Sequence, residues 1–263
     1  MKIAMISGSP KASGSASMYL LSQLEALLQG DEITIVPADV LMRLKDETER
    51  EKRIREMLGR DAIVLSFPLY FDAIPSNLLL FMQEAERIIE STPQSASAEI
   101  DVDGEMYVHK TVLHVIVNNG FYESSQNKTA IEMAHIWGNK CGFKRGSDIA
   151  VGAGGMVQMA PMGKGPMHNL GAAMKELAGD IRSYGSGRDT SYGAASDNCS
   201  WCFRSKKTNS NNRSEVILVE PNFPRFLYIQ CAHMGWHQMA KKNGLRAKDI
   251  EGIITKRIQD EDN

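Results

Sequence analysis

The sequence predicts a doubly wound α/β fold, in which helices cover both faces of a parallel sheet of five strands. The first observation is a series of short, continuously apolar segments that each have the length of a strand. The second is that segments with apolar residues at helical spacing alternate with them. Strands that are apolar on both faces are typical of parallel sheets enclosed by helices, and the regular alternation is typical of α/β proteins.

Length and composition agree with one large domain. The chain has 263 residues, of which 43% are hydrophobic and 24% charged, as in an average soluble protein. Its 30 basic and 32 acidic residues are nearly balanced, so we expect neither a nucleic-acid partner nor attraction to an anionic membrane. The most apolar stretch, residues 67–82, is interrupted by Asp72 and Pro75, whereas spanning a bilayer needs about 20 apolar residues. We therefore expect no membrane segment.

Three strands and three helices are expected in the first part of the chain. Residues 2–7 form an apolar run, and residues 33–37 are β-branched up to a proline. Between residues 46 and 60, acidic side chains precede basic ones by four positions, which stabilises an exposed helix. The expected strands span 2–7, 33–37 and 62–68, and the expected helices span 18–30, 46–60 and 75–89.

The second part of the chain continues the alternation and then departs from it. Residues 91–105 are polar and predict a loop, whereas the long polar stretch 185–214 predicts either a mobile cover over the site or an insertion without a role. Residues 216–220 are a candidate for a short extra strand outside the five. The other expected elements are strands at 111–119 and 148–151 and helices at 125–141, 169–184 and 226–243.

The four cysteines, Cys141, Cys199, Cys202 and Cys231, are few and widely spread, which indicates a reducing compartment. The N-terminal segment is not a signal peptide by its pattern, so we expect a cytoplasmic protein. A zinc site of Cys199, Cys202, Cys231 and His233 would lack a second closely spaced pair of ligands, and a four-cysteine cluster would need the distant Cys141. We therefore expect no bound metal.

Segments of distinct chemistry follow three of the expected strands, where ligands bind in open α/β sheets. Residues 8–17 offer hydroxyls, a lysine and a helix N-terminus, which suit a phosphate, although a helix cap with a turn would look similar. Residues 67–75 offer three aromatic rings between prolines, which suit a planar ligand or simply lead into the next helix. Residues 118–123 pair two amides with a glycine, which suits either a polar ligand edge or a turn.

Together, these three segments suit flavin mononucleotide (FMN), which has a phosphate, a planar ring and a polar ring edge. The first segment matches neither a Walker A loop nor the dinucleotide fingerprint, because the required glycines and the G-K-[ST] ending are missing. A second glycine-rich segment, residues 152–155, also fails the dinucleotide fingerprint.

These segments resemble the NAD(P)H-dependent FMN reductase family of the flavodoxin-like fold, whose strand order is 2-1-3-4-5. The resemblance rests on GSPKASGSAS (8–17), SFPLYFDAIPSNLLLFM (66–82) and NNGFYESSQNKTAIEMAHIWGNKCGF (118–143), and it covers residues 1–185. It implies that the first segment binds the FMN phosphate, the second lies beside the flavin ring and the third faces its pyrimidine end. Ala16 stands where the family often has a polar residue, so one phosphate contact would come from the backbone alone. The implied cofactor-binding residues are Ser9, Lys11, Ser15, Ala16, Ser17, Pro68, Leu69, Tyr70, Phe71, Asn118, Asn119, Gly120 and Phe121.

The implied activity is that of an FMN-dependent oxidoreductase, which passes a hydride from NADPH or NADH through flavin N5 to a small acceptor such as a flavin, quinone, nitro or azo compound. No side chain is required as an acid or base, so no catalytic residue is predicted. The alternatives are a non-catalytic electron carrier, which would usually be more acidic than this chain, and a flavin-free interaction module. Residues 186–263 are expected to form the insertion loop and a C-terminal helix packed on the same domain. The apolar bulk of that helix, together with the family's habit, predicts a homodimer or higher homo-oligomer.

Overall fold

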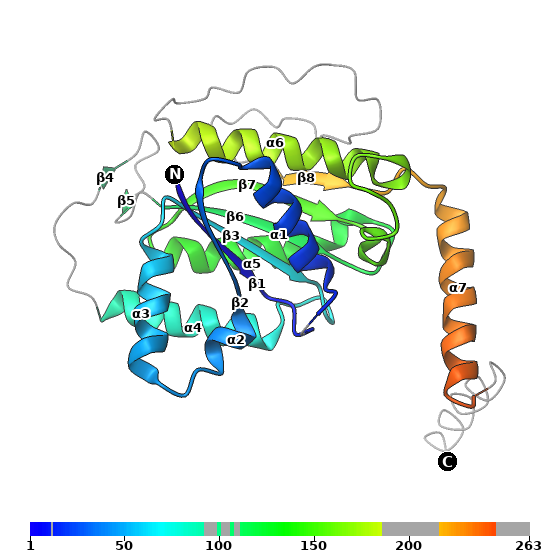
Figure 1. Ribbon diagram of the computed structural model, residues 1–263, viewed down its shortest axis with the longest axis horizontal. Helices are drawn as coiled ribbons and strands as arrows, with labels where there is room; N and C mark the ends of the chain where they lie inside the picture. Colours follow the sequence, from blue (N-terminus) through cyan, green and yellow to red (C-terminus); the bar gives the residue numbers. More distant parts are fainter. Residues whose placement is uncertain (12, 92–98, 101–105, 108–110, 186–215, 246–263) are drawn as a thin grey trace, which may run out of the picture. The chain divides into compact units, whose positions relative to one another are not determined.

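The computed structural model describes residues 1–11, 13–91, 99–100, 106–107, 111–185 and 216–245 (Figure 1). The chain divides into two units, Met1–Asn222 and Phe223–Asn263. The first unit contains the sheet and the helices that cover it. In the second unit the structure describes one helix, α7 (Arg225–Lys242), close to the predicted 226–243.

A parallel sheet of six strands forms the centre of the first unit, in the order β2-β1-β3-β6-β7-β8 (Figure 1). The first five strands in this order reproduce the predicted flavodoxin-like order 2-1-3-4-5, so the fold class is confirmed. The predicted count of five was wrong, because residues 216–219 pair with residues 148–151 and add a sixth strand at the edge. The strands are β1 (Lys2–Ser7), β2 (Glu32–Pro37), β3 (Ala62–Pro68), β6 (Val112–Asn118), β7 (Lys144–Val151) and β8 (Val216–Val219).

Helices cover both faces of the sheet (Figure 1). One face packs against α1 (Ala16–Leu27) and α6 (His168–Gly185). The opposite face packs against α2 (Ala38–Met42), α3 (Glu47–Leu58), α4 (Ser76–Glu90) and α5 (Lys128–Lys140). The short 3-10 helices η1 (Ser124–Asn127), η2 (Gly154–Met156) and η3 (Gly165–Met167) lie in the connections.

The structure corrects one boundary and adds elements at two places where the sequence pattern predicted none. β7 begins at Lys144, four residues before the predicted start, because its first residues are polar or glycine and break the apolar run. The five-residue helix α2 is too short to show a helical period. In the predicted loop 91–105, β4 (Glu99–Ile100) is a strand that pairs antiparallel with β5 (Met106–Tyr107).

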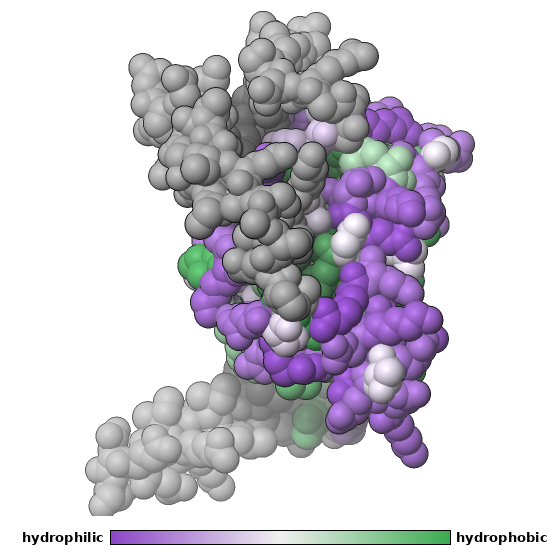
Figure 2. All heavy atoms as spheres, turned by 90° about the vertical axis from the view of Figure 1, so that its left-hand side faces the viewer, coloured by the Kyte–Doolittle hydropathy of each residue, from purple (hydrophilic) through white to green (hydrophobic). Residues whose placement is uncertain are grey.

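The side of the molecule from which the strands start is shown in Figure 2, where hydrophilic residues predominate among the coloured atoms. No helix among the described residues is both long enough and apolar enough to cross a membrane. Three of the large exposed apolar side chains of the first unit, Phe71, Phe121 and Met159, lie on loops at the opposite end of the strands.

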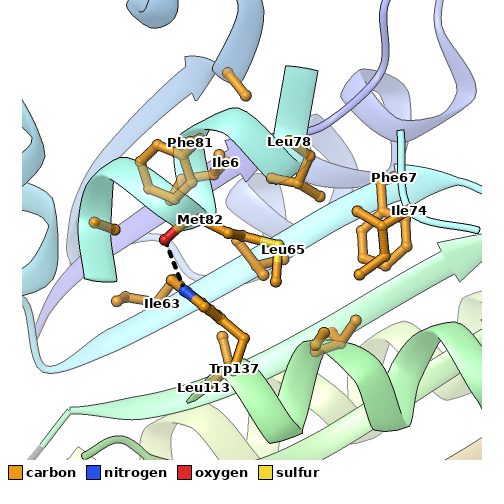
Figure 3. Packing of buried hydrophobic residues seen from close by; sticks show 14 of the residues in the cluster. Ile6, Ile63, Leu65, Phe67, Ile74, Leu78, Phe81, Met82, Leu113 and Trp137 are labelled. Carbon is orange, nitrogen blue, oxygen red and sulfur yellow. Dashed lines mark hydrogen bonds between the residues drawn. The ribbon is translucent and has the colours of Figure 1, made fainter. Parts of the chain in front are cut away.

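The core on the α4 and α5 face is built around Trp137, which is almost fully buried (Figure 3). Its indole Nε1–H donates a hydrogen bond of 2.9 Å to the carbonyl oxygen of Met82 in α4. The Trp137 ring also packs edge-on against Phe143 at a centroid distance of 5.7 Å. Burying a side chain of this size contributes roughly 3–5 kcal/mol, so this contact fixes α5 against α4.

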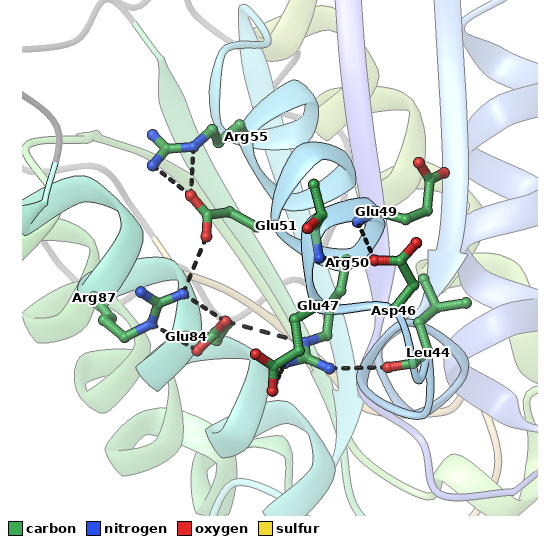
Figure 4. A network of polar contacts seen from close by, with 10 residues as sticks. Leu44, Asp46, Glu47, Glu49, Arg50, Glu51, Arg55, Glu84 and Arg87 are labelled. Carbon is green, nitrogen blue, oxygen red and sulfur yellow. Dashed lines mark hydrogen bonds and ion pairs between the residues drawn. The ribbon is translucent and has the colours of Figure 1, made fainter.

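A network of arginine and glutamate side chains connects α3 and α4 at the surface (Figure 4). Arg87 contacts Glu84 of its own helix at 2.9 Å and Glu51 of α3 at 3.4 Å. Arg50 donates a hydrogen bond of 2.9 Å to the Leu44 carbonyl and thereby holds the connection before α3. Exposed ion pairs of this kind contribute about 0–1 kcal/mol each, so the network positions α3 more than it stabilises the fold.

Candidate functional site

The candidate site lies at the carboxyl ends of β1, β3 and β6, which are neighbours in the sheet. The chain leaves β1 toward β2 on one side and returns to β3 on the other, so strand order reverses at β1 and β3. Ligands of doubly wound folds bind at such a reversal. The three predicted segments follow these strands, and the structure therefore brings them to one edge.

The segment after β1 turns sharply into α1. Ser9 is buried, and its hydroxyl accepts a hydrogen bond of 3.3 Å from the backbone N–H of Lys11, whose side chain is exposed. Gly8 passes so close to α4 that an added Cβ would lie 2.6 Å from Cδ2 of Leu78. Gly14 has a φ of +63°, which a side chain would resist. The glycines thus allow this segment to stay close to α4 and then reverse into α1.

Ser15 is the N-cap of α1, and its hydroxyl accepts a hydrogen bond of 3.1 Å from the N–H of Met18. The next residues, Ala16 and Ser17, begin the helix, and its first turn contains no acidic residue. In contrast, α3 starts with Asp46 as its cap and two glutamates in its first turn. No acidic side chain in this turn therefore offsets the partial positive charge at the start of α1, which favours an anion there.

The segment after β3 presents an aromatic ring to solvent through a tight turn. Tyr70 and Ala73 exchange two backbone hydrogen bonds, of 3.0 and 3.3 Å. The two residues between them, Phe71 and Asp72, have φ values of 49° and 56°, the left-handed region that a type I′ turn requires. This conformation costs about 1–2 kcal/mol for a residue with a Cβ. Its result is that Phe71 is fully exposed.

The segment after β6 is held in place by hydrogen bonds from the side chain and the backbone of Asn119. Asn119 is buried, donates a hydrogen bond of 3.0 Å from Nδ2 to the Glu123 carbonyl, and donates its backbone N–H to Val151 of β7. Its Oδ1 has no hydrogen-bond partner among the described residues. Gly120 and Phe121 follow at the surface, with 57% of Phe121 exposed. The segment therefore combines fixed amides with an exposed aromatic ring.

Asn118 connects all three segments. Its side-chain Oδ1 accepts a hydrogen bond of 3.1 Å from the Ser17 hydroxyl at the start of α1. Its backbone carbonyl accepts a hydrogen bond of 2.8 Å from the N–H of Leu69, which follows β3. Pro68, the last residue of β3, is its neighbour in the strand register. One buried residue thus joins the predicted phosphate segment, the aromatic segment and the amide segment.

The glycine-rich segment after β7 forms the next wall of the site. Gly154 donates its N–H to the Asn119 carbonyl, and a Cβ on Gly154 would lie 2.8 Å from that oxygen. Further along, the Gln158 side-chain amide donates a hydrogen bond of 3.2 Å to the Ser15 carbonyl. The segment therefore contacts both the amide segment and the cap of α1.

Two functional candidates at this edge, Ser124 and Glu220, were missed by the sequence reasoning. Glu220 follows β8, and its Oε1 accepts hydrogen bonds from Ser124, 2.8 Å from the hydroxyl and 3.3 Å from the backbone N–H. The signal in the sequence was the glutamate that ends the run VILVE, but its meaning depends on β8 joining the sheet.

All thirteen predicted site residues lie at this edge, on or next to the ends of β1, β3 and β6. The hydroxyls of Ser15 and Ser17 are engaged inside the protein, one with Met18 and the other with Asn118. Ser17 donates its O–H to Asn118, whereas the oxygens of Ser9 and Ser15 only accept hydrogen bonds. The donors that remain for a phosphate are therefore the O–H groups of Ser9 and Ser15, backbone N–H groups of the first turn and the exposed Lys11. The exposed rings of Tyr70, Phe71 and Phe121 fit a planar conjugated ligand, so the residues present fit FMN.

The predictions for the cysteine-containing stretch fall outside the described residues. Cys199, Cys202 and the whole of 186–215, including the predicted cover, belong to that part of the chain. Within the described ranges, no group of three or more His, Cys, Asp or Glu side chains is arranged to hold a metal ion.

Comparison with known proteins gives structural neighbours only. No protein-family model matches the chain, and no curated protein matches it. The Trp repressor binding protein of Bacillus subtilis is 17% identical over 66% of this chain and 96% of its own, with a TM-score of 0.47. A flavodoxin of Streptococcus pneumoniae TIGR4 is 10% identical over 69% and 98%, with a TM-score of 0.45. An NADH:FMN oxidoreductase in its apo form is 13% identical over 69% and 88%, with a TM-score of 0.48. Because these TM-scores lie below 0.5, we assign the fold from the strand order of this chain and infer no activity from these neighbours.

Proposed function

We propose that the protein is an FMN-dependent oxidoreductase that takes a hydride from NADPH or NADH and reduces a small acceptor such as a flavin, quinone, nitro or azo compound. The observation that carries this proposal is the position of Asn118. Its hydrogen bonds connect the N-terminus of α1, which suits a phosphate, with the exposed aromatic turn after β3 and with the amide segment after β6. These are the three kinds of surface that FMN needs, and they meet at the strand reversal.

Each segment has a separate task in this proposal. Backbone N–H groups at the start of α1, together with Lys11, bind the phosphate dianion. Phe71 and Tyr70 contact the ring system, and Asn119 and Gly120 face its polar end. Bound FMN supplies the hydride chemistry, and the protein binds it, orients it and shields one side of it. No described side chain is assigned as a proton donor or acceptor.

Flavin titration tests the cofactor. Flavin-free protein is titrated with FMN and with riboflavin, and FMN is expected to bind far more tightly because riboflavin lacks the phosphate. Ser17→Ala removes the hydrogen bond to Asn118 and should weaken FMN binding by about two- to tenfold. The matched control is Ser22→Ala, since Ser22 also lies on α1 but its hydroxyl donates only to the Tyr19 carbonyl on the exposed side. FMN affinity equal in Ser17→Ala and the wild type would count against the site.

Steady-state turnover tests the activity. An oxidoreductase should oxidise NADPH or NADH when a quinone or free flavin is added, and the rate should follow the fraction of protein loaded with FMN. An electron carrier would bind FMN and show no such oxidation. The two outcomes therefore separate the enzyme from the carrier without reference to the acceptor used in the cell.

A further inference from the structure

We propose that Glu220 is a positioning residue of the flavin site, which fixes the segment after β6 through Ser124 and places one negative charge at that edge. This inference rests on the proposed function for its flavin readouts, but its first step concerns the protein alone. No predicted site residue lies beyond residue 121, so the proposal extends the site to the strand that ends the sheet.

The contacts between Glu220 and Ser124 fix the far end of the amide segment. Ser124 is fully buried, and both its hydroxyl and its backbone N–H donate to the same Glu220 oxygen. The near end of the segment is fixed independently, because Asn119 donates its N–H to Val151 at 3.1 Å. Gly120, proposed to face the ring, and Phe121 lie between these two anchors, and the Phe121 carbonyl also accepts a hydrogen bond from the N–H of Ala153.

Glu220 is itself held in place by the sheet. Val219, the last residue of β8, accepts a hydrogen bond of 2.8 Å from Gly152 after β7. The Asn169 side chain donates to the Glu220 carbonyl at 3.2 Å, and the Tyr122 hydroxyl donates to the Pro221 carbonyl at 3.4 Å. A Cβ on Gly152 would lie 2.1 Å from the Tyr122 carbonyl oxygen, so the segments after β6 and β7 are in direct contact. The carboxylate therefore has a fixed position rather than that of a free surface side chain.

The charge of Glu220 should affect the midpoint potential of bound FMN, which a purely structural role would not change. Reduction of a flavin adds negative charge to the ring, and protein charges near the ring set its potential. A carboxylate at this edge opposes that change, so removing the charge should make the midpoint potential of bound FMN more positive. Because the amide oxygen of a glutamine can accept the same two hydrogen bonds, Glu220→Gln removes the charge while it leaves the segment in place.

The first experiment measures amide hydrogen exchange of residues 119–124 in the flavin-free protein. Glu220→Ala and Ser124→Ala should accelerate exchange there by about ten- to hundredfold, the factor expected when a hydrogen bond to a charged group is lost, and Glu220→Gln should not. If Glu220→Ala does not fold, Ser124→Ala, which deletes one oxygen, still carries the test. Exchange unchanged in the variants that remove the contact would overturn the proposal.

The second experiment measures FMN affinity and the midpoint potential of bound FMN. Glu220→Ala should bind FMN several-fold more weakly, and Glu220→Gln should shift the potential to more positive values. Glu86→Gln is the matched control, since it removes a carboxylate that pairs with Lys140 on the outer surface of α4 and α5. A potential that is the same in Glu220→Gln and Glu86→Gln would overturn the proposal. A wild-type protein that binds no FMN would instead refute the proposed function, and the exchange experiment would still decide whether Glu220 positions the segment.

Discussion

At the scale of single residues, Phe71 has a backbone conformation that opposes stability. It adopts a left-handed φ of 49° and exposes its whole ring, although neither is favourable for a phenylalanine in water. Phe71→Gly should therefore raise the free energy of unfolding by about 1 kcal/mol in urea titration of the flavin-free protein. The same change should weaken FMN binding, because the exposed ring is lost.

Asp72 provides the control for this prediction. It also has a left-handed φ, 56°, so Asp72→Gly relieves backbone strain without removing the aromatic ring. This variant should be at least as stable as the wild type and should bind FMN with unchanged affinity. Equal losses of FMN affinity in both variants would mean that the turn, and not the Phe71 ring, contacts the cofactor.

His114 makes stability depend on pH. It is completely buried on β6, where burial lowers its pKa from 6.5 to about 4, although a hydrogen bond from Nδ1 to the Ser147 carbonyl and the nearby Asp148 act in the opposite direction. Because the folded pKa lies below the unfolded value, only the unfolded chain binds the proton between pH 6.5 and 4. Neutral His114 contributes about 3 kcal/mol to the free energy of unfolding. This contribution is complete above pH 6.5 and is lost as the pH falls toward 4.

Urea titrations at pH 7 and pH 5 test this prediction. The wild type should lose more stability between the two values than His114→Asn, whose amide can still donate to the Ser147 carbonyl. The carboxylates that titrate in the same range are present in both proteins and therefore cancel. Equal losses in both proteins would show that His114 is not the group responsible.

At the scale of elements, Gly8 decides how closely the first segment approaches α4. A Cβ at this position would lie 2.6 Å from Leu78 and 2.9 Å from Cβ of Phe67, so one of these residues would have to move. Gly8→Ala should cost about 1–3 kcal/mol of unfolding free energy, as overpacking does elsewhere. Gly155→Ala is the control, because nothing lies within 4 Å of its added Cβ, and it should leave stability nearly unchanged. Thermal unfolding of the two variants measures the difference.

The sequence predicted an element well where its own residues form a clear apolar or charge pattern. The apolar run of β3 and the charge pairs of α3 identify those elements without knowledge of their neighbours. β8 was harder, since a four-residue apolar run becomes a strand only when an edge such as β7 is available to pair with it. The candidate site shows the same division. The phosphate, aromatic and amide segments are visible in the sequence, whereas the contact between Ser17 and Asn118 joins residues 101 positions apart and requires the folded sheet.

At the scale of the whole molecule, the second unit suggests how copies of the chain associate. Among the described residues of α7, large apolar side chains are exposed, which include Phe226, Met234, Trp236 and Met239. Exposed apolar surface of this kind usually serves an interface, so we expect a homodimer. Light scattering at micromolar concentration should give twice the chain mass of 29.1 kDa. Trp236→Lys should shift the measured mass toward one chain, whereas a monomeric wild type would contradict the expectation.

The position of β8 also determines when the proposed flavin site becomes complete during synthesis. The five strands β2, β1, β3, β6 and β7 all lie within residues 2–151, so they are synthesised before β8. Ser124, which ends the ring-facing segment, meets Glu220 only after the remaining chain up to β8 has emerged. A nascent chain would therefore contain every other strand of the sheet before it could complete the proposed flavin site. Under the proposed function, capture of the flavin would follow translation of the last strand.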